Sequence, residues 1–356
     1  MATLRKSAVL SLVLVLCACC QLAAQERYRP EVLFILDIAP DARASGMGDV
    51  GVATTPDVTS QKWNASKYIF ANMRHGVSVS YTPWMNKISR GLNMGLISGY
   101  TKFAGRSAIG FSATYLSIGG IDLYSREGLS QGTISSNEYS LDISYSHRLG
   151  DYVSGGISLR YASAIKVESF GIPNSAVLRP SPAFAGDVSF FYTRPVEMFN
   201  KENHLSAGIC VSNLGTKVKL SGDDEMLMPM NLRMGVTYDW ILDTKNSLTS
   251  SIDINKSLVP SGSYSSDITV FEAIGKSFEK ARDFIASLGF EYSYTKLAMV
   301  RAGYHHSRNS PSFRYFTLGG GLIYKSIHLD ASYLISTSSL NTALANTFRL
   351  TLGYVW

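Results

Sequence analysis

The sequence contains few cysteines and few charged residues. Four cysteines occur in 356 residues, and only Cys210 lies beyond residue 20. The rest of the chain therefore has no internal disulfide and no thiolate metal site. Asp, Glu, Lys and Arg make up 17% of the residues, the formal net charge is +6, and the basic residues are scattered singly. We therefore expect no nucleic-acid binding.

Long apolar runs are also lacking, except at the start of the chain. Arg5 and Lys6 precede an apolar stretch, residues 8–20, and small residues follow it. This order predicts a secretory signal peptide over residues 1–24, cleaved after Ala24. An alternative interpretation is lipidation of Cys19 within "LCAC". No later apolar run approaches the length of a transmembrane helix, so we expect none.

A short glycine-rich stretch starting at Gly46, "GMGDVG", fits the G-x-G-x-x-G pattern of dinucleotide-binding loops. That pattern binds a pyrophosphate only directly after a strand and at the start of a helix. Residues 31–36, "EVLFIL", could form a strand, but Pro40 lies between it and the glycines. No acidic residue occurs at positions 58–121 to bind a ribose. We expect the glycines to permit close backbone packing instead.

Most of the remaining sequence alternates apolar and polar residues with period two, as half-buried strands do. In residues 141–149, "LDISYSHRL", the apolar residues share one face. The segments are about 9–11 residues long, which is the length of a tilted membrane-spanning strand. Several apolar faces end in aromatic residues, as interfacial girdles require; examples are Tyr81 with Trp84, Tyr100 with Phe103, and Tyr238 with Trp240.

The pattern predicts an all-β transmembrane antiparallel barrel over residues 76–356. A closed barrel is expected because lipid offers no partner for an unpaired strand edge. The predicted strands, about fourteen of them, cover residues 76–84, 92–102, 107–118, 137–149, 152–164, 183–192, 204–213, 231–240, 246–255, 284–294, 298–306, 315–324, 327–335 and 345–356.

Short and long connections largely alternate along this series, as in barrels with tight periplasmic turns and extended outer loops. The longest exception on the short side is 193–203, and residues 268–282 predict a short helix within an outer loop. Exposed apolar residues in the long loops are candidate contacts for a protein partner, with packing on their own loop as the alternative. They are Phe170, Ile172, Val177, Leu178, Met226, Leu227 and Met228.

Residues 25–75 precede the first predicted strand, alternate poorly and contain many small residues. A barrel of about fourteen strands is wider than side chains alone can fill. We therefore expect this segment to be a hatch that plugs the lumen, with a periplasmic tail as the alternative. Its candidate residues are Pro40, Asp41, Arg43, Gly46, Gly48, Asp49, Gly51, Trp63 and Asn64.

Chemistry of an enzyme is not evident. His305 and His306 are adjacent on a strand and point to opposite faces, so they cannot chelate a metal together. We find no nucleophile–base set and no phosphate loop. We therefore expect no catalytic site, no metal site and no bound cofactor. Inward-facing charges should pair across the lumen or with the hatch: Asp142, Arg148, Arg160, Arg233, Asp239, Glu291, Arg301 and Asp330. Cys210 should be a passive buried thiol.

Two stretches carry a resemblance to known proteins. The segment 40–68, "PDARASGMGDVGVATTPDVTSQKWNASKY", resembles the N-terminal region of the PorV family of the type IX secretion system. It departs from that family's usual Asn-Pro-Ala at Asn64-Ala65-Ser66. The end, "NTFRLTLGYVW", resembles the C-terminal signature by which outer-membrane barrels are assembled, with Tyr354 and Trp356 on its apolar face; the alternative is an ordinary edge strand.

The resemblance implies a FadL-like barrel of fourteen strands with an N-terminal hatch, located in the outer membrane. PorQ is a related type. The resemblance also implies that the protein binds secreted proteins through their type IX C-terminal domain. It would transfer this cargo from the translocon to a sortase-like protein that attaches the cargo to surface lipopolysaccharide. The alternatives are a FadL-type transporter of hydrophobic small molecules and a soluble secreted β-protein.

Overall fold

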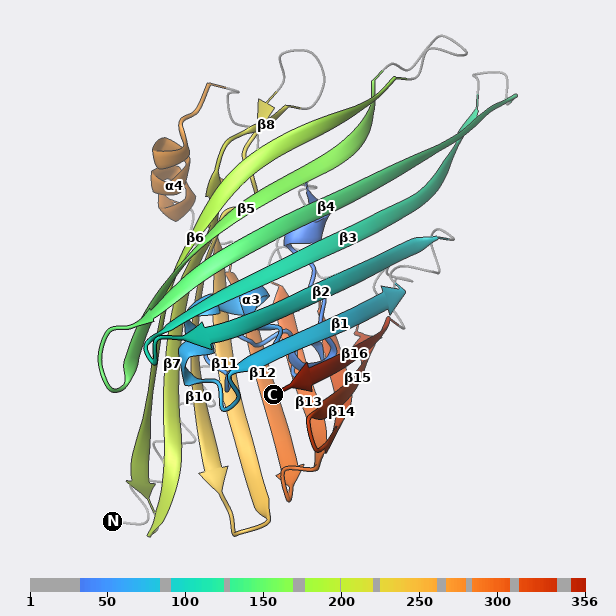
Figure 1. Cartoon of the computed structure of the whole chain (residues 1–356). Coiled ribbons are helices and arrows are strands. Elements are labelled where there is room, and N and C mark those ends of the chain that lie inside the picture. The colour runs from blue at the N-terminus through green and yellow to red at the C-terminus, as the bar shows by residue number, and fades with distance from the viewer. Residues whose placement is uncertain are drawn as a thin grey trace.

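The computed structural model describes residues 33–83, 91–124, 129–168, 177–198, 200–219, 225–260, 267–279, 284–307, 314–337 and 347–356. The predicted signal peptide and Cys19 lie outside these residues. Fourteen antiparallel strands close into one barrel (Figure 1). They are β1 (His75–Pro83), β2 (Leu92–Phe103), β3 (Ser107–Tyr124), β4 (Ser130–Arg148), β5 (Val153–Glu168), β6 (Val177–Met198), β7 (Lys201–Gly215), β10 (Asn231–Ile241), β11 (Asn246–Ser257), β12 (Phe284–Tyr294), β13 (Ala298–Ser307), β14 (Tyr315–Tyr324), β15 (Ile327–Ser336) and β16 (Phe348–Val355).

The barrel closes between β1 and β16, whose register runs from Gly76 opposite Val355 to Tyr81 opposite Leu350. Every other neighbouring pair in the wall is antiparallel. These pairs join strands that are consecutive in the chain, except that β7 pairs with β10. Backbone pairing between neighbouring strands thus runs around the whole ring, as a wall surrounded by lipid requires. The predicted fold class is confirmed.

Alternation along the strands separates the two faces of the wall. In β16 every second residue is exposed, from Phe348 to Tyr354, and the residues between them are buried. Two belts of exposed aromatic residues follow the two ends of the barrel, as expected for a membrane-spanning wall. Near the long connections they include Tyr81, Phe184, Phe284, Phe316 and Phe348, and near the short turns Phe103, Tyr145, Tyr294, Tyr324 and Trp356. The prediction for Tyr100 is wrong, because this residue faces inward and stacks on Tyr68 with ring centroids 4.8 Å apart.

The strand bounds agree with the predicted ones to within a few residues, except in β3–β6. These strands reach beyond their neighbours at the long-connection end and project as two hairpins (Figure 1). Residues 193–203 were predicted as a long connection, but 193–198 complete β6 and 201–203 begin β7, with Met198 opposite Lys201. The exception in the alternation of short and long connections thus disappears.

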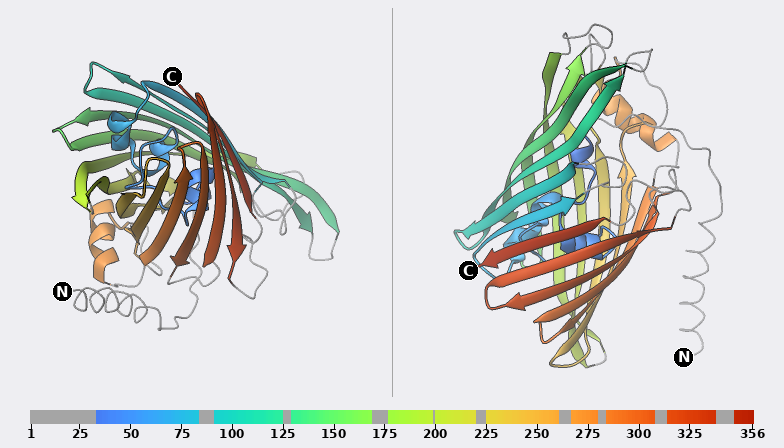
Figure 2. Two further views of the ribbon diagram at one scale, coloured as in Figure 1. Left: turned by 90° about the horizontal axis from the view of Figure 1, so that it is seen from below. Right: turned by 90° about the vertical axis from the view of Figure 1, so that its right-hand side faces the viewer.

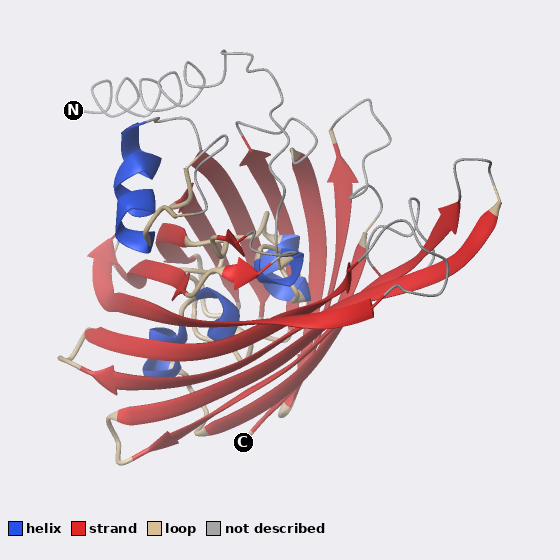
Figure 3. Ribbon diagram, turned by 90° about the horizontal axis from the view of Figure 1, so that it is seen from above, coloured by secondary structure: helices blue, strands red, loops and turns tan. Residues whose placement is uncertain are grey.

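Residues 33–74 lie inside the ring of strands (Figure 2, Figure 3). This segment, called the hatch below, contains η1 (Phe34–Leu36), α2 (Ala42–Gly46), α3 (Ser60–Trp63) and η2 (Ala65–Phe70). Residues 31–36, which could have formed a strand, do not do so in their described part, which forms a single 3-10 turn. A strand there would need an edge to pair with, and the closed wall offers none.

Two long connections carry structure of their own. Between β7 and β10, β8 (Val218–Lys219) pairs with β9 (Glu225–Met226). Between β11 and β12, α4 (Val270–Glu279) confirms the predicted helix in a shorter form. Among the described residues no helix has the length and apolarity to cross a membrane.

Candidate functional site

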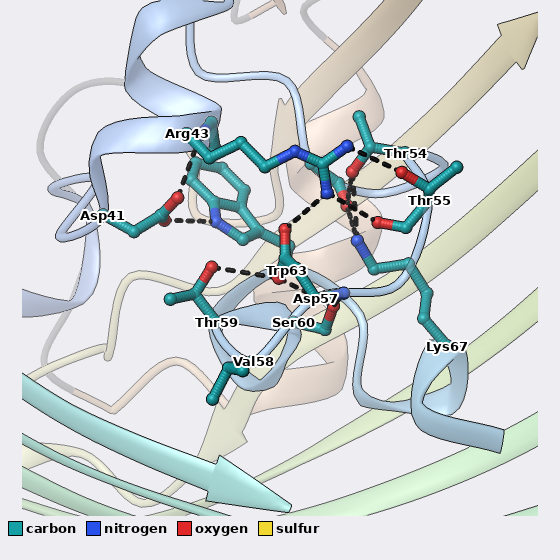
Figure 4. A network of polar contacts seen from close by, with 12 residues as sticks. Asp41, Arg43, Thr54, Thr55, Asp57, Val58, Thr59, Ser60, Trp63 and Lys67 are labelled. Carbon is teal, nitrogen blue, oxygen red and sulfur yellow. Dashed lines mark hydrogen bonds and ion pairs between the residues drawn. The ribbon is translucent and has the colours of Figure 1, made fainter. Parts of the chain in front are cut away.

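Asp41 organises the centre of the hatch. Its carboxylate accepts a hydrogen bond from the Ala44 backbone N–H (2.9 Å), which caps the N-terminus of α2. Its second oxygen accepts from Nε1 of Trp63 (2.8 Å), so one side chain joins α2 to α3 (Figure 4). Burial, reinforced by nearby Asp57, raises the pKa of Asp41 to about 6.

Arg43 connects the hatch to the wall. Its guanidinium donates to the Thr55 carbonyl (3.0 Å) and to the Asp57 carboxylate (2.9 Å) within the hatch (Figure 4). On its other side it reaches Glu291 of β12, with Nη2–Oε1 at 3.2 Å. The planar guanidinium suits such a bridge because it has several donors in fixed directions.

The ion pairs continue from Glu291 along the wall. Arg301 of β13 donates to Glu291 (2.6 Å) and, through Nη1, to Asp330 of β15 (2.6 Å). A second cluster joins Arg160 of β5 to Asp142 of β4 and to Asp187 of β6 (3.0 Å). The prediction that inward charges pair across the lumen or with the hatch is confirmed for these residues. Arg148 instead donates to backbone carbonyls of its own turn.

Lys67 is the most deeply buried cation of the hatch. Its ammonium donates to the Gly51 carbonyl (2.6 Å) and to the Thr54 hydroxyl (3.1 Å) (Figure 4). Burial lowers the pKa of Lys67 to about 8, although the Asp57 carboxylate partly offsets this effect. The ammonium thus fastens the loop after α2 to η2.

The glycine-rich stretch packs directly against the wall. A Cβ atom on Gly303 of β13 would lie 2.1 Å from the Gly48 nitrogen, and one on Gly319 of β14 would lie 3.0 Å from the Gly46 Cα atom. Gly48 also has φ +75°, a conformation that favours glycine. Facing glycines in hatch and wall therefore bring the two backbones into contact, as the sequence predicted for this stretch.

Hydrogen bonds attach the hatch to strands around most of the circumference. Wall side chains accept from hatch amides: Glu138 from Ile35 (2.8 Å), Thr351 from Ala42 (2.9 Å), Thr317 from Gly48 (2.9 Å) and Asp253 from Gly51 (2.8 Å). Wall hydroxyls donate to hatch carbonyls: Ser146 to Ala65 (2.8 Å) and Ser154 to Ser66 (2.7 Å). Breaking one strand contact would leave the others in place.

The remaining predicted hatch residues take part in the same attachment. Asn64 accepts from the Ser66 amide (3.1 Å) and donates to the Phe190 carbonyl of β6 (3.0 Å), so its side chain sets the turn where the family usually has proline. Asp49 accepts from the Tyr315 hydroxyl (2.5 Å). Pro40 is buried beside the N-cap of α2. The structure therefore gathers all the predicted hatch residues in one segment within the barrel.

The half of the lumen nearest the long connections contains a cluster of buried apolar side chains. Leu33, Ile35, Leu36 and Ile38 of the hatch form one cluster with inward-facing residues of the wall, namely Leu92, Met94, Leu116, Ala162, Ala164, Ala183, Ala185, Tyr315 and Leu334. Met228 from the β7–β10 connection joins them. This apolar plug was not predicted, because "EVLFIL" has the composition of an ordinary strand.

The predicted outer contacts differ in their placement. Leu227 and Met228 are buried, so their expected exposure is wrong: each packs into an apolar cluster. Met226 is half-buried, and Val177 and Leu178 begin β6. Phe170 and Ile172 lie outside the described residues. Sequence reasoning missed Phe271 and Phe278 of α4, although aromatic residues seven positions apart on a short helix share one face.

No cluster of three or more His, Cys, Asp or Glu suited to a metal occurs in the part of the chain that the structure describes. Cys210 lies buried on the inner face of β7 as a free thiol. The "GMGDVG" stretch forms the end of α2 and a turn against the wall.

Comparisons with known proteins give a family and a fold. The model of the family described as "Type IX secretion system protein PorV" matches residues 23–264. The solved toluene transporter TodX of Pseudomonas putida is 11% identical over 88% of this chain and 96% of its own, with a TM-score of 0.53. The toluene transporter TbuX of Ralstonia pickettii is 11% identical over 90% and 99%, with a TM-score of 0.51. No curated protein sequence matches the chain.

Proposed function

Because this chain belongs to the family of the type IX secretion system protein PorV, we propose that it is the shuttle of that system. In this role it binds the C-terminal domain of exported cargo outside the cell and carries the cargo from the translocon to a sortase-type attachment complex. The family match supports an outer-membrane component of type IX secretion; the cargo-binding and delivery steps are our proposal.

The state of the lumen is the observation that favours a shuttle over a channel. The hatch is hydrogen-bonded to strands around most of the circumference, and the apolar half of the lumen contains residues of the chain itself. A protein in this state can act through its rim, where a rigid wall holds long connections. Cargo domains then need only reach the outer surface.

The two projecting hairpins are the part of the rim best suited to a β-rich partner. Pairing of β4 with β5 extends only to Glu138 opposite Ala164, whereas β4 begins at Ser130 and β5 ends at Glu168. Beyond this pair the β3–β4 and β5–β6 hairpins separate (Figure 1). Backbone edges of this kind can take up an added strand. Val177 and Leu178 lie here, opposite Glu168 and Val167.

The first experiment is deletion of the gene and analysis of surface proteins. Accumulation in the periplasm of proteins that share one C-terminal domain supports the proposal. Unchanged surface display of all such proteins would overturn it.

A second experiment maps the contact by a photo-crosslinking amino acid at Leu178. We expect crosslinks to cargo in cells that secrete it. The matched control is the same amino acid at Tyr294, on the lipid-facing side near the short turns. Equal capture of cargo at both positions would contradict a contact at the hairpins.

Transport of hydrophobic small molecules is the second candidate. The fold shared with toluene transporters and the apolar outer half of the lumen favour it. It predicts that the deletion strain loses uptake of an apolar nutrient while surface proteins remain normal. The two candidates therefore give opposite results in the deletion experiment.

A further inference from the structure

Helix α4 lies beside the outside of the barrel wall, beyond the ring of strands (Figure 2, Figure 3). Ala273 of α4 belongs to an apolar cluster against which Val211 of β7 and Leu232 of β10 also pack. Both wall residues point outward, in line with the exposed Ile209 and Met234 of the same strands. The helix thus covers positions of the lipid-facing surface.

Lys256 of β11 marks the part of the lipid-facing surface that α4 covers. Along the outer face of β11, Ile252 and Ile254 are 46% and 41% exposed, but Lys256, the next residue on that face, is 1% exposed. Its ammonium lies 5.9 Å from the ring centroid of Phe278 in α4 and 5.3 Å from that of Phe284 in β12. Phe278 and Phe284 therefore lie near the same ammonium group. Phe284 belongs to the aromatic belt near the long connections, called the outer aromatic belt below.

The outer aromatic belt is interrupted beneath α4. Across β11, β10 and β7, the residues in register with Phe284 are Lys256, Leu232 and Val211. None of the three is aromatic. The helix brings Phe271 and Phe278 to this part of the wall.

The surface of α4 has three distinct sides. Ala273 and Ser277 are buried, and Ala273 belongs to the apolar cluster described above. Glu272 and Lys276 form an exposed ion pair at 2.7 Å. Between these sides lie Phe271, 86% exposed, and Phe278, 53% exposed. A helix with one charged face and one face of bulky apolar residues, held at the edge of a lipid-facing surface, has the form of an interfacial helix.

We propose that α4 lies in the outer membrane interface and inserts Phe271 and Phe278 among the acyl chains of the outer leaflet. The helix thereby completes the aromatic belt over β7, β10 and β11. The occupant is lipid because the exposed rings continue a lipid-facing surface: Ile252 and Ile254 are exposed on the same face of β11 as Lys256, which contacts Phe278. This proposal rests on the barrel alone and is independent of the secretion function.

The test is nitroxide accessibility in lipid nanodiscs. Single cysteines at Phe271→Cys and Phe278→Cys, in a Cys210→Ala background, carry the label. Ile254→Cys on the wall is the lipid-facing control, and Lys276→Cys on the same helix is the water-facing control. Accessibility to oxygen, which concentrates in lipid, is compared with accessibility to a water-soluble nickel chelate. Heat-modifiable migration in gels verifies that each variant is a folded barrel.

We expect the ratio of oxygen to nickel accessibility at 271 and 278 to follow that at 254 and to exceed that at 276. If position 271 matches position 276 in folded protein, the helix faces water and the proposal is wrong. That outcome would instead indicate a surface open to a protein partner. Because Lys276 is on the same helix, unfolding or displacement of α4 would change both labels together and be recognised.

Discussion

His75 and Trp356 exchange both backbone hydrogen bonds and stack their rings. The amide of His75 donates to the Trp356 carbonyl (2.9 Å), the amide of Trp356 donates to the His75 carbonyl (3.1 Å), and the ring centroids lie 5.2 Å apart. This contact adds one pair to the seam between β1 and β16, at the end with the short turns. The last aromatic residue thus fastens the joint that closes the barrel.

Trp356→Ala should weaken this seam. The backbone bonds remain, but stacking on His75 and Tyr354 is lost, at a cost of about 1 kcal/mol beyond the lost area. Urea unfolding in lipid vesicles, followed by gel migration, measures the change. Trp356→Phe keeps an aromatic ring and should unfold close to the wild type. Identical midpoints for the two variants would contradict a stabilising role of the ring contacts.

Gly303→Val should disturb the seat of the hatch. A Cβ atom at this position would lie 2.1 Å from the Gly48 nitrogen, so the hatch backbone has to move. We expect destabilisation of about 1–3 kcal/mol or more from overpacking, and cleavage of the hatch by added protease. The control is Gly320→Ala on the neighbouring strand, where the nearest atom would be 3.8 Å away. A Gly303→Val barrel as protease-resistant as the control would argue against contact between hatch and wall.

Glu291→Gln should damage the link between Arg43 and Arg301. Both guanidinium groups lose part of their counter-charge in a buried site, and breaking a buried ion pair costs about 3–5 kcal/mol. The unfolding free energy of the barrel is the measured quantity. Glu272→Gln, in the exposed pair on α4, should leave it unchanged. Equal effects from both substitutions would show that the buried network adds no stability.

Lys67 should make the barrel more stable as the pH rises. Its pKa is about 8 in the folded protein against an ordinary 10.5, so between these values the unfolded chain binds more protons. The free energy of unfolding therefore increases from pH 8 to pH 10.5, and the full cost of burying the charge is present below pH 8. Lys67→Met should flatten this rise, whereas Lys276→Met on the exposed face of α4 should keep it. An unchanged slope in Lys67→Met would contradict the burial of the charge.

The wall was predictable because lipid and the lumen impose opposite demands on successive residues. Alternation in segments such as 141–149 predicts both the strand and the face of each side chain, so the strand bounds agree to within a few residues outside β3–β6. Close packing of the hatch glycines was expected because their backbone needs space within a finite lumen, but the facing glycines of the wall, Gly303 and Gly319, were not predicted. Family-like features in the hatch and the C-terminal strand pointed to the same architecture.

Other features depend on contacts that a single sequence does not specify. Tyr100 is of a residue type common in aromatic belts, but it faces the lumen and stacks on the ring of Tyr68. Leu227 and Met228 occur in a long connection, yet the connection folds back and buries them. The charge of Lys256 does not predict that α4 covers this side chain.

The position of the hatch also has a consequence for biogenesis. Helix α2 rests against β13–β16, the strands made last, while η2 rests against β2–β6. Contacts to the first and to the last strands thus meet on one segment of the chain, and they can all form together only when β16 has joined β1. We therefore expect the interior to take its final form at the moment the wall closes, so that folding of the hatch and insertion into the membrane are coupled.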